Sequence, residues 1–150
     1  MKIRTICDSD CDFFAKYARA EDIAECLSVT KLPLSEHIRI GRNNSVESYV
    51  LVDEQDRPCA LYGIMLDDRG FNITWLLTTV FVEDHKLSFM KEVRNRVKKW
   101  YKEYGDLFVV TDLRYKRALK LNEWAGFKKV GHNVSINGVD FGIFRFSTEK

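Results

Sequence analysis

Three side chains in the last third of the chain could take part in proton transfer. Asp112 comes just after the predicted strand 107–111, and Tyr115 and Asn122 lie further along the chain. A carboxylate can accept a proton and a phenol can donate one, whereas an amide cannot act as an acid at any useful pKa. Each residue also has an ordinary structural use, since Asp caps helices at strand-to-helix junctions and Tyr packs or caps. We expect these structural roles for Asp112 and Tyr115.

The elements that would position these residues follow from the periodicity of the chain. Alternating or continuous apolar runs predict strands, and apolar residues at every third or fourth position predict helices. Gly105 and Gly126 are expected to end helices, and Asn137-Gly138 is a strong signal for a two-residue hairpin turn. The expected strands cover 2–6, 46–52, 59–66, 71–82, 107–111, 127–136 and 139–146. The expected helices cover 8–30 in two pieces, 36–40 between Ser35 as N-cap and Gly41, 87–104 and 114–125.

These elements predict a mixed α/β fold. The order is written β-α-α-β-β-β-α-β-α-β-β, with an antiparallel meander in the middle and one crossover that can place two strands in parallel. Helices are expected on both faces of a mostly antiparallel sheet. The 150 residues show no linker or repeat, so we expect a single domain over 1–150.

Composition excludes several classes of protein. A hydrophobic fraction of 45% and a charged fraction of 31% are typical of a globular protein rather than a disordered one. No apolar run approaches the length of a membrane span, and the N-terminus lacks a signal-peptide core, so secretion is not expected. The four cysteines and three histidines show no ligand spacing, which predicts no metal site and reduced, partly buried thiols.

The order of elements, with a helix leaving the strand 71–82 and Gly126-Phe127 after the last helix, resembles the acyl-CoA N-acyltransferase (GNAT-type) fold. By topology the resemblance covers nearly the whole chain, and by residues it begins at Phe71. A narrower resemblance is to small GNAT-like proteins described as internal virion proteins of short-tailed bacteriophages. It is carried by four loose motifs in order: DIAE at 22–25, YGI at 62–64, WLLT at 75–78, and YKEY at 101–104 followed by Leu107 and Gly126-Phe127.

Active members of the superfamily bind acyl-CoA through backbone amides of the motif R/Q-x-x-G-x-G/A. Its glycines allow close approach, and the helix that follows presents its positive end to the diphosphate. The corresponding stretch here, EDHKLS at 83–88, has no glycine and carries two carboxylates. We therefore expect no cofactor. If acetyl-CoA binds nevertheless, the resemblance assigns its contacts to Val80, Val82, His85, Lys86, Leu87 and Ser88.

The resemblance also defines the catalytic positions. The family motif N-x-x-A-x-x-x-Y places its alanine on Ala118. Its asparagine position holds Tyr115, and its tyrosine position, which supplies the general acid for the leaving thiolate, holds Asn122. The expectation is therefore no catalytic residues, with Tyr115, Asp112 and Asn122 as the candidates if the protein is an enzyme.

Charge is distributed unevenly along the chain although the net charge is only +2. Acids gather near the N-terminus, and two later helices carry cations that could form a basic face or an ordinary solvated surface. The acids include Asp8, Asp10, Asp12, Glu21, Asp22 and Glu25. The basic face would comprise Lys91, Arg94, Lys98, Lys102, Lys116, Arg117 and Lys120.

The sequence thus leaves three functional hypotheses. The first is a catalytically degenerate GNAT-like protein of a tailed phage that binds other virion or assembly proteins and is located in the virion or the host cytoplasm. The second is an active acetyl-CoA-dependent N-acetyltransferase. The third is a small host-takeover protein that binds a host factor or nucleic acid through the basic helix.

Overall fold

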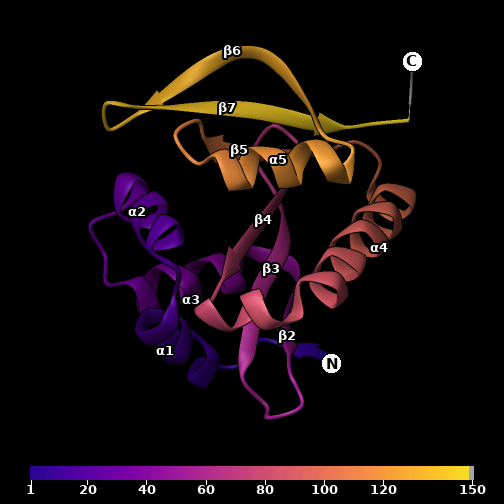
Figure 1. Cartoon of the computed structure of the whole chain (residues 1–150). Helices are drawn as coiled ribbons and strands as arrows, with labels where there is room; N and C mark the ends of the chain where they lie inside the picture. Colours follow the sequence, from indigo (N-terminus) through magenta and orange to yellow (C-terminus); the bar gives the residue numbers. More distant parts are fainter. Residues whose placement is uncertain (149–150) are drawn as a thin grey trace.

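Seven strands form one sheet in the order β1-β2-β3-β4-β5-β7-β6. All neighbouring strands are antiparallel except β4 and β5, which run parallel. The computed structural model describes residues 1–148, shown in Figure 1. The elements are β1 Lys2–Thr5, α1 Asp8–Tyr17, α2 Ala20–Val29, α3 Leu34–Asn44, β2 Ser45–Val52, β3 Pro58–Leu66, β4 Asn72–Thr78, the 3-10 helix η1 Val80–His85, α4 Lys86–Tyr104, β5 Leu107–Asp112, α5 Lys116–Ala125, β6 Lys128–Ile136 and β7 Val139–Phe146.

The predicted fold class is confirmed: the sheet is mixed and mostly antiparallel, with helices on both faces (Figure 1). Between the first two strands there are three helices, where the predicted order counted two. The hairpin at Asn137-Gly138 is also confirmed. Asn137 has φ 52° and Gly138 has φ 82°, and two positive φ values in sequence are those of a type I′ turn.

Helix α3 is longer than the predicted helix 36–40. Pro33 occupies its N-cap with an extended backbone, so the ring lies where no amide is needed, and His37 N donates to Pro33 O at 3.0 Å. Gly41 does not end the helix, because α3 continues to Asn44. Ser45, after the last turn, closes the end by donating to Gly41 O at 2.7 Å.

Strand β4 is shorter than the predicted strand 71–82 and ends at Thr78. The turn between α1 and α2 docks here, where Ala18 bridges Thr79 and Arg19 N donates to Thr78 O at 3.2 Å. The Thr79 hydroxyl donates to Pro58 O at 2.6 Å and accepts a hydrogen bond from Phe81 N. These contacts turn the chain into η1, so residues 80–85 are a 3-10 helix instead of strand.

The two faces of the sheet bury separate apolar clusters. On one face Phe14 of α1 and Leu61 of β3 are both 0% exposed and pack with α3. On the other face, Tyr62 of β3 packs with Trp100 of α4. Neighbouring residues of β3 thus serve opposite clusters, as the alternation of a doubly covered strand requires. Within residues 1–148, no helix combines the length and apolar character needed to cross a bilayer.

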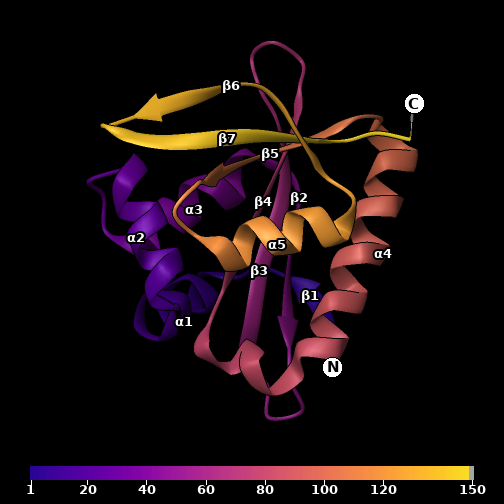
Figure 2. The same cartoon turned by 45° about the horizontal axis from the view of Figure 1, so that its top comes forward.

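Strands β4 and β5 pair over only two positions, Asn72 with Leu107 and Ile73 with Phe108. The Thr74 hydroxyl then donates to Phe108 O at 3.2 Å, and beyond this point the strands separate. Figure 2 shows the two arrows pointing in different directions, with α5 lying across the space between them. This opening in the sheet determines where a ligand can enter.

Candidate active site at the opening between β4 and β5

Two clefts meet at the opening between β4 and β5. The outer cleft, of about 430 Å³, lies among η1, the start of α4, α5 and the turn between α1 and α2. The inner cleft, of about 550 Å³, lies among α2, α3, β4, β5 and the tip of the β6–β7 hairpin. Both clefts are lined by Asp22 of α2, Leu76 of β4, and Ala118 and Leu121 of α5, so the two spaces adjoin at the opening. Both volumes are in the range of ligand sites.

The outer cleft has a basic rim that converges on one carboxylate. Glu83 Oε1 lies 3.1 Å from Arg19 Nη2 and 2.8 Å from Arg117 Nη1, and Glu83 Oε2 lies 3.1 Å from Lys86 Nζ. Lys120 also lines this cleft. The four cations of this cleft outnumber its three acids, Glu21, Asp22 and Glu83, so its lining has a net positive charge, which suits an anionic ligand.

One donor at this rim has no hydrogen bond. Arg19 Nη2 is buried, and although it lies within ion-pair distance of Glu83, the geometry is not that of a hydrogen bond. An unsatisfied buried donor of this kind is uncommon and costs free energy unless an acceptor reaches it. It therefore points to an acceptor that a ligand would bring.

The six residues that the resemblance assigned to CoA divide between this cleft and the surface. Val82, 2% exposed, and Lys86 line the outer cleft. Leu87 is 86% exposed, and Val80 and Ser88 are also exposed and line neither cleft. The sixth, His85, turns toward the β2–β3 turn, where its Nε2 lies 3.5 Å from the carboxylate of Asp53.

One face of α2 lines the inner cleft. Four side chains at helical spacing line it: Asp22, Glu25, Cys26 and Val29. Asp22 is held at the end of β4, because its Oδ2 accepts hydrogen bonds from Thr78 N at 3.1 Å and from Thr78 Oγ1 at 2.6 Å. The Glu25 carboxylate is hydrogen-bonded by the backbone of Asp112, and no side chain among the described residues is hydrogen-bonded to it. Glu25 is therefore the carboxylate of the inner cleft that can serve a ligand.

The surroundings of Glu25 change its proton affinity. Burial, followed by the nearby carboxylates of Asp22 and Asp112, raises the pKa of Glu25 to about 7. A carboxyl group with this pKa can accept and release a proton near neutral pH, as a general base must. Burial, followed by the carboxylates of Asp22 and Glu25, raises the pKa of Cys26 to about 12. This thiol therefore stays protonated and is not a nucleophile.

The far wall and the roof of the inner cleft are fixed by other elements. His37 and Gly41 of α3 line the wall, and burial lowers the pKa of His37, which keeps its ring neutral. At the roof, the hairpin tip is joined to α2 by Asn137 Nδ2, which donates to Ser28 O at 2.9 Å. Arg114 Nη2 donates to Ser28 Oγ at 3.3 Å from the other side.

Asp112, one of the three predicted catalytic candidates, is 0% exposed and fully engaged. Its Oδ2 accepts a hydrogen bond from Arg114 Nη2 at 2.7 Å and its Oδ1 from Arg114 N at 2.9 Å. Burial opposes ionisation, but these hydrogen bonds outweigh it and lower the pKa of Asp112. The carboxylate shapes the turn before α5, although the N-cap itself is Tyr115.

The structure separates the other two candidates. Tyr115 lies outside both clefts on a shallow surface hollow with Glu21 and Lys116, and burial raises its pKa. Asn122 lines the inner cleft, and its Nδ2 donates to Thr111 Oγ1 of β5 at 2.9 Å. The residue at the family's tyrosine position thus fastens α5 to β5.

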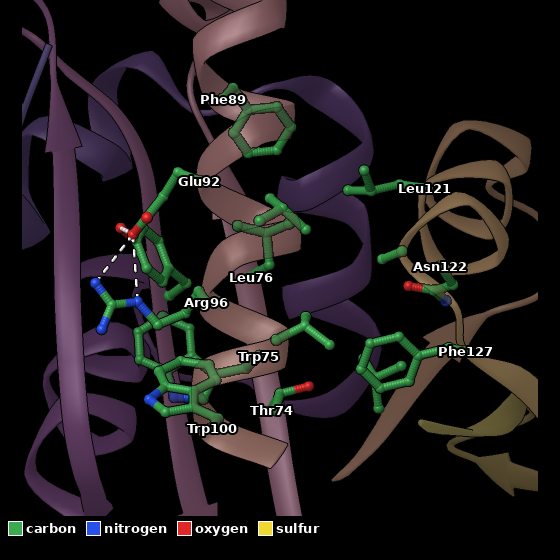
Figure 3. A pocket seen from close by; sticks show the side chains of 15 residues that line it. Thr74, Trp75, Leu76, Phe89, Glu92, Arg96, Trp100, Leu121, Asn122 and Phe127 are labelled. Carbon is green, nitrogen blue, oxygen red and sulfur yellow. Dashed lines mark hydrogen bonds and ion pairs between the residues drawn. The ribbon is translucent and has the colours of Figure 1, made fainter. Parts of the chain in front are cut away.

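A third, small pocket of about 60 Å³ lies beside the opening between α4 and α5. Figure 3 shows Leu76 of β4 in this space, with Leu121 and Asn122 facing it from α5. Its polar edge is closed, because Glu92 accepts hydrogen bonds from the Tyr62 hydroxyl and from Arg96 Nη2, the latter at 3.1 Å. The pocket is too small for a cofactor and is a packing gap next to the site.

The seven residues of the predicted basic face are all exposed on α4 and α5. Arg94 of α4 stacks on the Trp124 ring at 3.9 Å and donates to Trp124 O. Arg117 and Lys120 of α5 line the outer cleft. The remaining members are exposed cations: Lys91, Lys98 and Lys102 on α4 and Lys116 on α5. Nucleic-acid binding through this face stays a prediction.

The cysteines are free, with Cys7 exposed and the other three buried, as expected for reduced structural thiols. One cluster was not visible in the sequence: ligand atoms of Asp53, Cys59 and His85 lie within 4.8 Å of one another. Asp53 Oδ2 already accepts a hydrogen bond from Arg57 Nε at 2.8 Å, and its Oδ1 accepts the backbone amides of residues 55 and 57. The Asp53 carboxylate is therefore already engaged by its own turn.

Sequence reasoning missed the two side chains that matter most here, Arg19 and Glu25. Arg19 falls in the short break between two helices, and nothing local indicates its burial. A signal existed for Glu25: Asp22 and Glu25 share the face of α2 that carries Cys26, and two acids on a half-apolar face indicate a buried polar site.

The fold matches solved acetyltransferases. A spermidine N-acetyltransferase from Vibrio cholerae in complex with CoA and spermine is 16% identical with a TM-score of 0.70, covering 97% of this chain and 94% of that chain. An aminoglycoside acetyltransferase in complex with coenzyme A is 16% identical with a TM-score of 0.71, covering 98% and 94%. A ribosomal-protein-S5-alanine acetyltransferase from Vibrio fischeri is 15% identical with a TM-score of 0.66, covering 98% and 92%.

No protein-family model and no curated protein sequence matches the chain. At the identities given above, the structural likeness shows the fold, and the predicted GNAT acetyltransferase fold is confirmed. None of these three structures is a virion protein, so association with virion or assembly proteins stays a prediction.

Proposed function

We propose that this protein transfers an acetyl group from acetyl-CoA to an amine, which is the second of the three hypotheses drawn from the sequence. The observation that carries the proposal is the meeting of two clefts of opposite charge at the opening between β4 and β5. The outer cleft has one more cation than acids, whereas the inner cleft has Glu25, shares Asp22 with the outer cleft, and has no Lys or Arg among its described lining residues. An anionic cofactor and a cationic acceptor can therefore approach each other from opposite sides of the sheet.

The residues of the outer cleft fit the phosphates of the cofactor. Arg19, Lys86, Arg117 and Lys120 would hold them, and the buried Arg19 Nη2 has the unused donor that a phosphate or amide oxygen needs. The glycine-rich loop of the family is absent, and η1 takes its place. Side-chain cations would then bind the phosphates that backbone amides bind in that loop. The phosphates would displace the Glu83 carboxylate from these cations.

In the inner cleft, Glu25 would prepare the acceptor. Amines are largely protonated at neutral pH, so a base must take a proton before or during attack. Glu25 takes the proton that the amine loses as the new nitrogen–carbonyl bond forms and the thioester carbon–sulfur bond breaks. Acetyl-CoA supplies the activated acetyl group, and no residue of the chain becomes acylated.

The departing sulfur receives no proton from the family position, because Asn122 is an amide fixed to Thr111. Tyr115 lies outside both clefts and does not replace the missing acid. The sulfur therefore leaves as a thiolate and takes its proton from solvent. A slower reaction than in enzymes with a side-chain acid follows, since general acid–base catalysis contributes roughly 10²–10⁴-fold.

Calorimetric titration with CoA followed by a free-thiol release assay with acetyl-CoA and a panel of amines tests the proposal. Saturable CoA binding and amine-dependent thiol release are expected. The Glu25→Gln variant should lower kcat by at least about 100-fold with CoA affinity unchanged. Absence of CoA binding at millimolar concentration, or thiol release that ignores the amine, would refute the assignment.

A further inference from the structure

The inner cleft also defines the class of acceptor. We propose that it takes a primary amine with a single positive charge on a compact apolar body, such as an arylalkylamine, in preference to a polyamine, an aminoglycoside or an amino acid. This inference rests on the proposed function, because it assumes that the inner cleft is the acceptor side. It goes further by stating what the cleft selects.

The number of available carboxylates sets the charge of the acceptor. Asp22 lies at the junction of the two clefts, because it lines both of them, and its Oδ2 is held by Thr78 at the end of β4. Among the described residues, Glu25 is therefore the one acid that lines the inner cleft and not the outer cleft. One ammonium group can be paired there, through a charge-assisted hydrogen bond.

A second positive charge placed in the inner cleft away from that junction would have no partner. Beyond the two acids of α2, the polar residues that line the cleft are uncharged side chains, including Asn44, Thr74 and a neutral His37. A second ammonium group placed against them would lose its hydration without gaining a counter-charge. This disfavours the polyamines, whose charges are spaced along a chain.

A negative charge on the acceptor is excluded by the same lining. Among the described residues that form the inner cleft, none is Lys or Arg. A carboxylate entering with the amine, as in an amino acid, would face Asp22 and Glu25 with no cation to balance it. The acceptor therefore carries its amine as its one ionised group.

The apolar body of the acceptor has a matching surface. Most of the remaining lining is aliphatic or aromatic and comes from several elements, including Ile38 of α3, Met65 of β3, Trp75 of β4, Val110 of β5 and Phe141 of β7. A volume of about 550 Å³ accommodates a ring with a short chain, with room left for the acetyl group at the opening. Burial of the apolar part of the acceptor supplies most of its binding free energy.

Two measurements test the inference separately from the function. Calorimetry without acetyl-CoA compares the binding of 2-phenylethylamine, spermidine, kanamycin and phenylalanine, and initial rates with acetyl-CoA compare the same four compounds. We expect 2-phenylethylamine to bind at least tenfold more tightly than the others and to give the highest kcat/KM. Equal or tighter binding of spermidine would overturn the inference, whatever the rates are.

Two variants locate the binding. Glu25→Gln should weaken the binding of 2-phenylethylamine at least tenfold by removing the counter-charge. Gly41→Leu should also weaken it, because Gly41 lines the cleft and an added Cβ meets no atom within 4 Å, which leaves room for a side chain that fills the space. Undiminished binding in both variants would refute the site. Selective binding of 2-phenylethylamine without turnover would support the inference and refute the proposed function. Turnover with spermidine as the preferred acceptor would support the proposed function and refute the inference.

Discussion

Asp22 and Thr78 are 56 residues apart in the chain, and one carboxylate oxygen of Asp22 accepts both the backbone amide and the hydroxyl of Thr78. This contact joins α2 to the last residue of β4, at the point where the sheet opens. The face of α2 that carries Glu25 is thereby held over the opening. The geometry of the inner cleft depends on this one pair.

Replacement of Thr78 by Val removes the hydroxyl and keeps the shape of the side chain. The buried Asp22 carboxylate then retains one donor in place of two, so we expect a loss of about 1–3 kcal/mol of stability. Urea unfolding at pH 7 measures it. Thr78→Ser is the matched control, because it keeps the hydroxyl and should lose much less. Equal losses in the two variants would show that the methyl group, and not the hydrogen bond, matters.

Glu25 should make stability depend on pH. Its pKa rises from 4.5 to about 7 on folding, in a setting that also contains Asp22, Asp112, Cys26 and His37. Between these values the folded protein binds a proton that the unfolded chain does not. Stability therefore falls as pH rises from about 4.5 to 7, by up to about 3 kcal/mol from this group.

Glu25→Gln should abolish that part of the pH dependence. We expect the variant to be more stable than the parent at pH 8 and to approach it near pH 4.5, as measured by urea unfolding at intervals of one pH unit. Glu21→Gln on the same helix is the control and should keep the slope of the parent. If the two curves of Glu25→Gln and the parent run parallel, Glu25 does not titrate in this window.

Glu83 should compete with the cofactor for the basic rim. Removal of its charge by Glu83→Gln frees Arg19, Lys86 and Arg117, and we expect CoA to bind about fivefold more tightly at low salt, the scale of an exposed ion pair. Asp84→Asn makes the same change in net charge one residue away and should have a smaller effect. Weaker binding by Glu83→Gln would mean that Glu83 orders the cations for the ligand instead of competing.

Two glycines offer a test of the fold. Gly126 ends α5 with φ +101°, and an added Cβ would lie 2.9 Å from the Phe146 ring. Gly126→Ala should destabilise the protein by about 2 kcal/mol. Gly41→Ala, inside α3 with nothing within 4 Å, should instead stabilise it by about 0.5–1 kcal/mol. Thermal unfolding followed by circular dichroism distinguishes the two signs.

Local signals predicted the elements wherever local chemistry decides them. The turn at Asn137-Gly138 and helix α4 lie where the residue pattern indicates, since both depend on neighbours in the chain. The end of β4 was predicted wrongly, because residues 80–82 are apolar and β-prone but the chain is turned by Thr79 and the α1–α2 connection. A contact with a segment 60 residues away has no local signature.

The site was less predictable than the fold for the same reason. The sequence motif directed attention to the loop at 83–88 and to Asn122, and both depart from the family pattern. The structure adds Arg19, from the connection between α1 and α2, and Glu25, from α2. Their significance comes from burial and from charges supplied by other elements, and neither can be read from spacing along the chain.

The two shared residue pairs between β4 and β5 have a mechanical consequence. The sheet consists of two parts, β1 to β4 and β5 to β7, that are joined at one end only, because β4 and β5 have no paired residues further along. A ligand bound between these two parts would add contacts that join them, so we expect the sheet to become more rigid as the site is occupied. Slower relative motion of the two parts of the sheet would then report ligand binding as directly as turnover does.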